Sequence, residues 1–101
     1  MTEAAFQSAV MKRLRVRFKG LPAFFWKVTD KFRGGIPDIV GCYKGIMWAI
    51  ELKVGKNKTS ALQDVAIGSL QKAGAMVAVC WTMEEVMEFI ETVIKRGDEN
   101  V

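Results

Sequence analysis

The chain contains no histidine. Without an imidazole, the sequence excludes a Ser-His-Asp or Cys-His catalytic arrangement, a histidine general base and a histidine-ligated zinc site. Its two cysteines, Cys42 and Cys80, are too few for a disulfide framework or a four-ligand zinc site, so we expect two buried free thiols. An enzyme built from this sequence would have to work with carboxylates, lysines and a metal ion.

The chain also lacks a long uncharged run and a charged-then-apolar opening segment, so neither a membrane span nor a signal peptide is expected. Half of its 101 residues are hydrophobic, which predicts one globular domain over residues 1–95 and a frayed tail over residues 96–101. We expect a soluble intracellular protein. The net charge of +4, from 15 basic and 11 acidic residues, favours a polyanionic partner.

Hydrophobic periodicity predicts an α/β domain with a central mixed four-stranded sheet flanked by helices. Helices are expected over residues 3–18, 60–73 and 82–95, and strands over residues 23–28, 38–43, 46–54 and 75–81. The third strand is apolar on both faces, which predicts a central position. Its helical crossover to the fourth strand predicts that these two strands are parallel.

Two details of packing follow from the same pattern. The helix over residues 60–73 is expected to bury a stripe made of Leu62, Ala66, Ile67 and Leu70, and the strand over residues 75–81 to be buried on both sides. The aromatic side chains exceed what we expect a single copy to bury. We therefore expect some of them at an interface between copies, among Phe24, Phe25, Trp48 and Trp81.

Three charged residues interrupt segments that otherwise read as core. Asp38 follows a Gly-Gly-Ile-Pro turn, and Glu51 and Lys53 share one face of the third strand because strand side chains alternate. An unpaired buried charge costs several kcal/mol, so we expect a divalent cation between Asp38 and Glu51. The alternative is an exposed Glu51–Lys53 pair, which would contribute about 0.2–1 kcal/mol.

These motifs resemble the PD-(D/E)xK nuclease superfamily, and within it the virus-type replication-repair nuclease (VRR-NUC) domain. The resemblance covers residues 2–94. Its features are Glu3 early in the first helix, Gly35-Ile36-Pro37-Asp38, Ile50-Glu51-Leu52-Lys53 and Ser60-Ala61-Leu62-Gln63, with twelve residues between Asp38 and Glu51. Each has a simpler interpretation: Glu3 could serve only the helix dipole, and Gln63 only a capping box begun by Ser60.

The resemblance implies a phosphodiester hydrolase that uses Mg²⁺ or Mn²⁺ and no organic cofactor. Asp38, Glu51 and the Leu52 backbone carbonyl would hold the metal, and Glu3 would reach it directly or through water. Lys53 would orient the attacking water or stabilise the developing phosphate charge, and Gln63 would fix the water network or a phosphate oxygen. The residues expected to contact DNA phosphates are Lys27, Lys31, Arg33, Lys44, Lys56 and Lys58.

The resemblance further implies a stand-alone domain of bacteria or phages, acting in the cytoplasm in DNA repair or recombination. Its expected substrate is branched DNA, with the four-way Holliday junction favoured, cut by a homodimer. Three alternatives remain: a flap or single-strand nuclease of the same family, a restriction-type enzyme, and a non-catalytic nucleic-acid-binding domain. A decayed, structural partner protein is disfavoured by the intact Asp38, Glu51 and Lys53.

Overall fold

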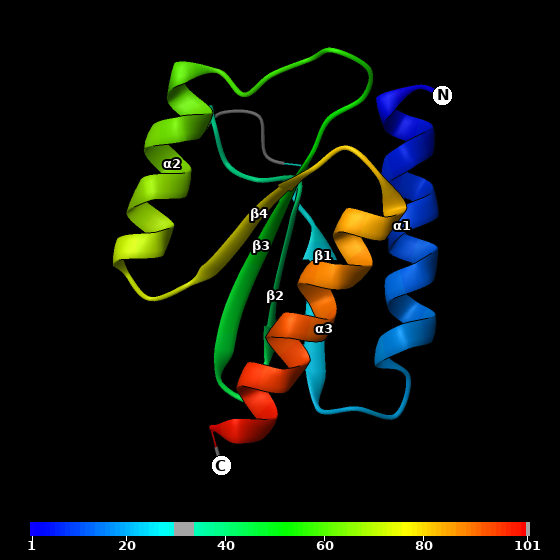
Figure 1. Cartoon of the computed structure of the whole chain (residues 1–101), viewed down its shortest axis with the longest axis vertical. Helices are drawn as coiled ribbons and strands as arrows, with labels where there is room; N and C mark the ends of the chain where they lie inside the picture. The colour runs from blue at the N-terminus through cyan, green and yellow to red at the C-terminus, as the bar shows by residue number, and fades with distance from the viewer. Residues whose placement is uncertain (30–33, 101) are drawn as a thin grey trace.

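Three helices and four strands make up the part of the chain that the computed structural model describes, residues 1–29 and 34–100 (Figure 1). In chain order they are α1 (Glu3–Phe18), β1 (Ala23–Lys27), β2 (Ile39–Tyr43), β3 (Ile46–Leu52), α2 (Ala61–Lys72), β4 (Met76–Cys80) and α3 (Met83–Glu99). The predicted number, type and order of elements are confirmed. No helix in the described part of the chain is long and apolar enough to cross a membrane.

The strands form one mixed sheet in the order β1-β2-β3-β4. β1 pairs with β2 and β2 with β3 in antiparallel fashion, whereas β3 and β4 are parallel. The predicted parallel pair is thereby confirmed, and β3 is hydrogen-bonded on both sides. Lys44 and Gly45 both have positive φ, 47° and 84°, which gives the β2–β3 hairpin the handedness that matches strand twist.

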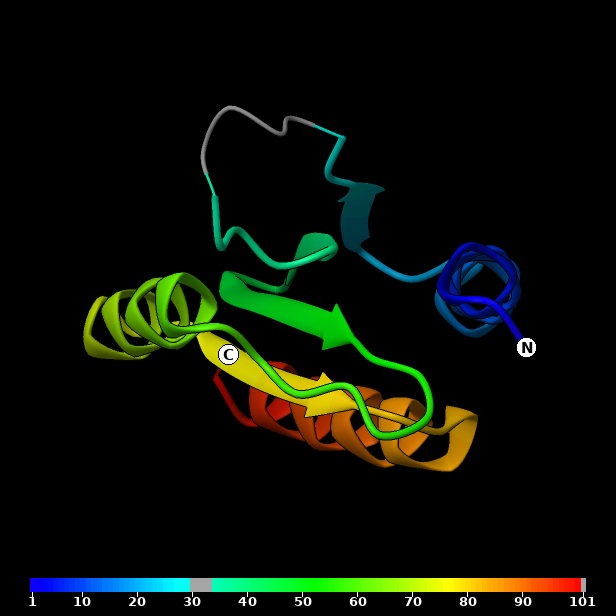
Figure 2. The same ribbon diagram turned by 90° about the horizontal axis from the view of Figure 1, so that it is seen from above.

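One face of the sheet carries the hydrophobic core, and α1 and α3 cover it (Figures 1 and 2). Register places alternate residues of β2 and β3 on this face, where burying each large apolar side chain stabilises the fold by about 1.5–3 kcal/mol. The buried side chains are Phe6, Val10, Leu14 and Phe18 from α1, Ile39, Tyr43, Trp48, Ile50 and Leu52 from the sheet, and Val86, Ile90 and Val93 from α3.

The opposite face is covered by α2 alone, which packs against β4 (Figure 2). The predicted buried stripe of α2 is wrong, because none of its residues is buried and Leu62 is exposed. The prediction that β4 is buried on both sides is also wrong, since only Cys80 of that strand is buried. Both errors have one cause: β4 is an edge strand, and no third layer covers α2.

The part of this face that α2 does not reach exposes a group of side chains that we call the open face: Phe24, Trp26, Cys42 and Met47. Phe24 lies directly opposite Cys42, and Cys42 opposite Met47, so three strands contribute to one row. Phe24 is 68%, Trp26 49% and Met47 43% exposed. The expectation that both cysteines are buried fails for Cys42, whereas Cys80 is buried.

The end of the chain also differs from its prediction. Instead of fraying from residue 96, α3 continues to Glu99, and Val101 lies outside the described residues. Gly97 is buried against the Tyr43 ring, and the Asp98 carboxylate accepts hydrogen bonds from Tyr43 Oη at 2.7 Å and Lys44 Nζ at 2.8 Å. These tertiary contacts keep the last turn helical where local sequence alone would leave it frayed.

Gly97→Ala should therefore destabilise the protein by about 1–3 kcal/mol, because the added Cβ would overlap the Tyr43 ring. Gly68→Ala in α2 is the matched control: nothing lies within 4 Å of its Cβ, and alanine favours the helix by about 1 kcal/mol. Urea unfolding of both variants measures the difference. Equal, stabilising effects of the two substitutions would contradict the packed last turn.

Candidate metal centre

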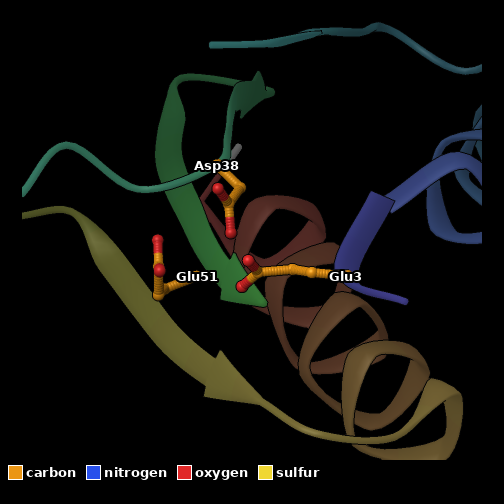
Figure 3. A group of neighbouring side chains, drawn as sticks. All are labelled: Glu3, Asp38 and Glu51. Carbon is orange, nitrogen blue, oxygen red and sulfur yellow. The ribbon is translucent and has the colours of Figure 1, made fainter. Parts of the chain in front are cut away.

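Three carboxylates from distant parts of the sequence meet at one end of the sheet (Figure 3). Glu3 is the first residue of α1, Asp38 directly precedes β2, and Glu51 is the last but one residue of β3. Each offers one oxygen atom, and these atoms all lie within 4.8 Å of one another. The structure thus brings together the three acidic residues that the sequence analysis singled out.

Asp38 is fixed by backbone contacts on both sides. The Leu52 N–H donates a hydrogen bond of 2.8 Å to Asp38 Oδ2, and the Val28 N–H donates one of the same length to the Asp38 carbonyl. Before it, Gly35 has a φ of +89° and lies against the Leu62 carbonyl, where no Cβ would fit. The Gly-Gly pair in the sequence predicts a tight turn or a close approach of another backbone here, and Gly35 makes such an approach.

Glu51 is a buried carboxylate, only 2% exposed, with unequal partners for its two oxygens. Oε2 accepts a hydrogen bond of 2.7 Å from Gln63 Nε2 and lies 3.2 Å from Lys53 Nζ. Oε1 is buried and has no hydrogen-bond partner among the described residues. Burial, followed by the negative charge of Asp38, raises the pKa of Glu51 to about 7, while Lys53 opposes the rise.

Gln63 and Lys53 complete the site. Gln63 accepts from the Ser60 N–H at 2.9 Å and so belongs to a capping box, as one interpretation predicts, and the same side-chain amide donates to Glu51. Lys53 beside Glu51 is only 12% exposed, so the interpretation of these two as an exposed surface pair is wrong. Both contacts constrain the position of Glu51 Oε2.

The residues expected to contact DNA are dispersed. Lys27 is the last residue of β1 and pairs with Ile39, so it lies at the same end of the sheet as Asp38. Lys56 and Lys58 are exposed and follow β3. Lys44, by contrast, lies in the turn at the other end of β2 and β3, where it is ion-paired with Asp98, and the structure does not bring it to the site. The other two, Lys31 and Arg33, lie outside the described residues.

The carboxylate cluster has the features of a site for a hard divalent cation. Its donors are oxygens, which Mg²⁺ and Mn²⁺ prefer, and the buried Glu51 Oε1 lacks any other partner in the described part of the chain. The raised pKa of Glu51 shows that the protein alone compensates its charge incompletely. A cation among Glu3, Asp38 and Glu51 would supply the missing compensation.

Comparison with solved structures identifies the fold. A structure described as "VRR_NUC domain" is 28% identical, with a TM-score of 0.66, over 83% of this chain and 92% of its own. The chain carries a VRR-NUC domain. A second structure, "VRR_NUC domain protein", is 24% identical, with a TM-score of 0.77, over 94% of this chain and 89% of its own.

No family sequence model and no curated protein matches the chain. The structural similarity assigns it to a nuclease family, and the mixed four-stranded sheet flanked by helices is the restriction-endonuclease-like fold expected from the sequence. The VRR-NUC similarity covers most of both chains in each comparison.

Glu51→Gln should stabilise the metal-free protein at pH 8 but not at pH 4.5. A folded-state pKa of about 7, above the ordinary 4.5, contributes stability that is present below pH 4.5 and lost as the pH rises to 7. Glutamine does not ionise, so at pH 8 the free energy of unfolding of the variant should exceed that of wild type by about 1–3 kcal/mol. Urea unfolding in EDTA at both pH values measures the gap.

The control for this experiment is Glu88→Gln, which changes an exposed glutamate of α3. The free energy of unfolding of this control variant should differ little from that of wild type, and by a similar amount at the two pH values. A Glu51→Gln gap that does not change with pH would contradict the raised pKa of this carboxyl group.

Proposed function

We propose that this VRR-NUC domain is a metal-dependent, structure-selective DNA endonuclease that hydrolyses phosphodiester bonds and resolves four-way junctions as a homodimer. The observation that carries the proposal is the cluster of Glu3, Asp38 and Glu51, with a buried carboxylate oxygen left unpartnered beside Lys53, within the described part of a nuclease-family fold. Carboxylates, a lysine and a hard cation suffice for phosphodiester hydrolysis in a chain without histidine.

Asp38, Glu51 and the Leu52 carbonyl would hold Mg²⁺ or Mn²⁺, and Glu3 would close the remaining side. The N–H and C=O of a strand residue point to the same side, so the bond from the Leu52 N–H to Asp38 supports a Leu52 carbonyl that faces the cluster. When bound, the cation supplies Lewis-acid polarisation of the phosphate and lowers the pKa of water. Gln7 lies one turn after Glu3 on α1 and would share this role.

The groups of the chain would then act on the substrate from fixed positions. Lys53 is held beside Glu51 Oε2, where its ammonium can donate to a phosphate oxygen as negative charge develops, an interaction that strengthens in the transition state. Gln63 holds the same carboxylate oxygen through its amide N–H. Its role is that of a positioning residue for Glu51, because the amide oxygen is already used by the Ser60 N–H.

Substrate affinity would come from phosphate contacts and not from base readout. Lys27, Lys56 and Lys58 are exposed near the carboxylate end of the sheet, and the sequence adds Lys31 and Arg33. Contacts of this kind make binding salt-dependent and independent of sequence. A structure-selective nuclease needs this mode of recognition, since the shape of a branch and not its base sequence defines the target.

The open face supports a second copy of the chain as the partner. Its four residues are uncharged, so they offer no ion pair to phosphate, and they expose a continuous apolar row on three strands. The expected interface aromatics include Phe24, which is exposed, whereas Trp48 is fully buried in the core of one copy. A twofold dimer would present two metal centres, as paired cuts in a four-way junction require.

Asp38→Asn and Lys53→Ala should each reduce cleavage by at least about a hundredfold while preserving the fold. Asparagine can still accept from the Leu52 N–H but removes the ligand charge, and alanine removes the donor to the developing phosphate charge. End-labelled four-way junction, flap, single-stranded and duplex DNA, each with Mg²⁺, Mn²⁺ or EDTA, provide the assay.

The matched control is Lys72→Gln, an exposed change at the far end of α2 that should cut like wild type. Paired symmetrical nicks in the junction, lost in EDTA, are the expected wild-type result. Cleavage of flaps or single strands instead would favour the other nuclease activity of the family. Salt-sensitive binding without metal-dependent cleavage of any substrate would indicate a non-catalytic nucleic-acid-binding domain.

Phe24→Lys with Met47→Lys should convert the protein from a dimer to a monomer, because two charges would have to be buried in an apolar interface. Light scattering after size exclusion, at micromolar concentration, measures the state. Val65→Lys on α2 is the control, since Val65 is an exposed apolar residue outside the open face. A monomeric wild type, or a dimer that survives the double substitution, would refute this interface.

A further inference from the structure

A pocket of about 220 Å³ lies between α1 and the end of β1, and we call it the α1–β1 pocket. It is separate from the three carboxylates of the metal centre, none of which lines it. The residues that line it are Gln7, Ser8, Met11, Lys12, Arg15 and Lys27.

Among the described residues, the charges that line the pocket are all positive. Lys12, Arg15 and Lys27 line it, and none of the three forms an ion pair with another described residue. Arg17, on the same helix, differs because it makes a two-point contact with Glu91 of α3. In the described part of the chain no carboxylate competes for the three cations, so an external anion would gain charge-assisted hydrogen bonds from them.

The polar lining fits a phosphate group better than a nucleobase. The Ser8 hydroxyl and the Gln7 amide add hydrogen-bond donors to the three cations, and no aromatic side chain stands among the described residues that line the pocket. Such a set of donors recognises phosphate oxygens regardless of base sequence.

The pocket adjoins the metal centre on two sides. Gln7 lies one turn after Glu3 on α1, and Lys27 pairs with Ile39, the residue that follows Asp38. Met11, one of the lining residues, is about 12 Å from Glu3 along the helix axis at about 1.5 Å per residue.

We propose that the α1–β1 pocket binds a backbone phosphate of the DNA that lies a few nucleotides from the phosphate at the metal centre. This inference rests on the proposed function for its substrate. Arg15 and Lys12 are the principal ligands, and Lys27 contributes from the opposite wall. The pocket sets the direction in which the bound strand leaves the carboxylate cluster, along α1.

Arg15→Gln compared with Arg13→Gln tests the proposal. Both arginines are exposed on α1 two residues apart, but Arg13 lines a different hollow, with Ala9, Lys12, Val16 and Met83. Only Lys12 lines both hollows, and Arg15 lines the α1–β1 pocket alone. Binding of a labelled four-way junction and of a plain duplex is measured in EDTA by fluorescence anisotropy at several salt concentrations. Arg15→Gln should reduce the slope of log affinity against log salt by about 0.9, and Lys12→Gln with Arg15→Gln by about 1.8.

Arg13→Gln should leave that slope unchanged. Equal slopes for Arg15→Gln and Arg13→Gln would overturn the phosphate pocket even if the wild type cleaves DNA. A selective loss with Arg15→Gln supports the pocket even if no metal-dependent cleavage is found, because the binding assay contains EDTA. Failure of the pocket and failure of the nuclease assignment therefore give different results.

A single neutral methylphosphonate in the DNA locates the contact. Placed in turn at successive linkages beside a fixed branch point, it should weaken wild-type binding about tenfold at one or two positions. The same substitution should have no effect on binding by Arg15→Gln, whose ligand is already missing. Equal weakening of wild type and Arg15→Gln at every linkage would overturn the assignment of Arg15 to that phosphate.

Discussion

The charge of Glu51 is the constraint on which the candidate site depends. A carboxylate that is almost fully buried must be compensated, and the chain supplies Gln63 and Lys53 to one oxygen only. The second oxygen remains without a partner in the described residues, and the pKa of the group is raised to about 7. A cation bound beside Glu51 would offset this uncompensated charge. Its binding would in turn stabilise the folded state.

The two faces of the sheet have different roles. The core face, under α1 and α3, supplies the apolar burial that holds β2 and β3 in register, and that register sets Asp38 beside Leu52. The second face carries Glu51 under α2 and leaves Phe24 and Met47 uncovered. The apolar core thus lies on one face, while Glu51 and the proposed subunit contact share the other, and Glu3 reaches the cluster from α1 on the core face.

Local sequence was sufficient to predict the elements, the parallel β3–β4 pair and the pairing of Asp38 with Glu51, because periodicity, caps and strand alternation act over a few residues. The place of Glu3 beside them was implied by the family resemblance alone. It failed where burial depends on neighbouring layers: α2 buries none of its residues, and Cys42 is exposed. Gly97 packs against Tyr43 through a contact between residues far apart in sequence, which no local pattern reveals. For the same reason, the ion pair between Lys44 and Asp98 could not be predicted from the sequence.

The capping box of α2 has a thermodynamic consequence for the site. Gln63 joins the first turn of α2 to Glu51, yet this helix has no buried residue to anchor it. Segments with little buried apolar surface open most readily in the native state, so α2 is a candidate for local unfolding. Each such opening would release the carboxylate from its amide partner. Local opening at the start of α2, measured by hydrogen exchange, and binding of a cation at Glu51 would therefore be linked equilibria, and each would report on the other.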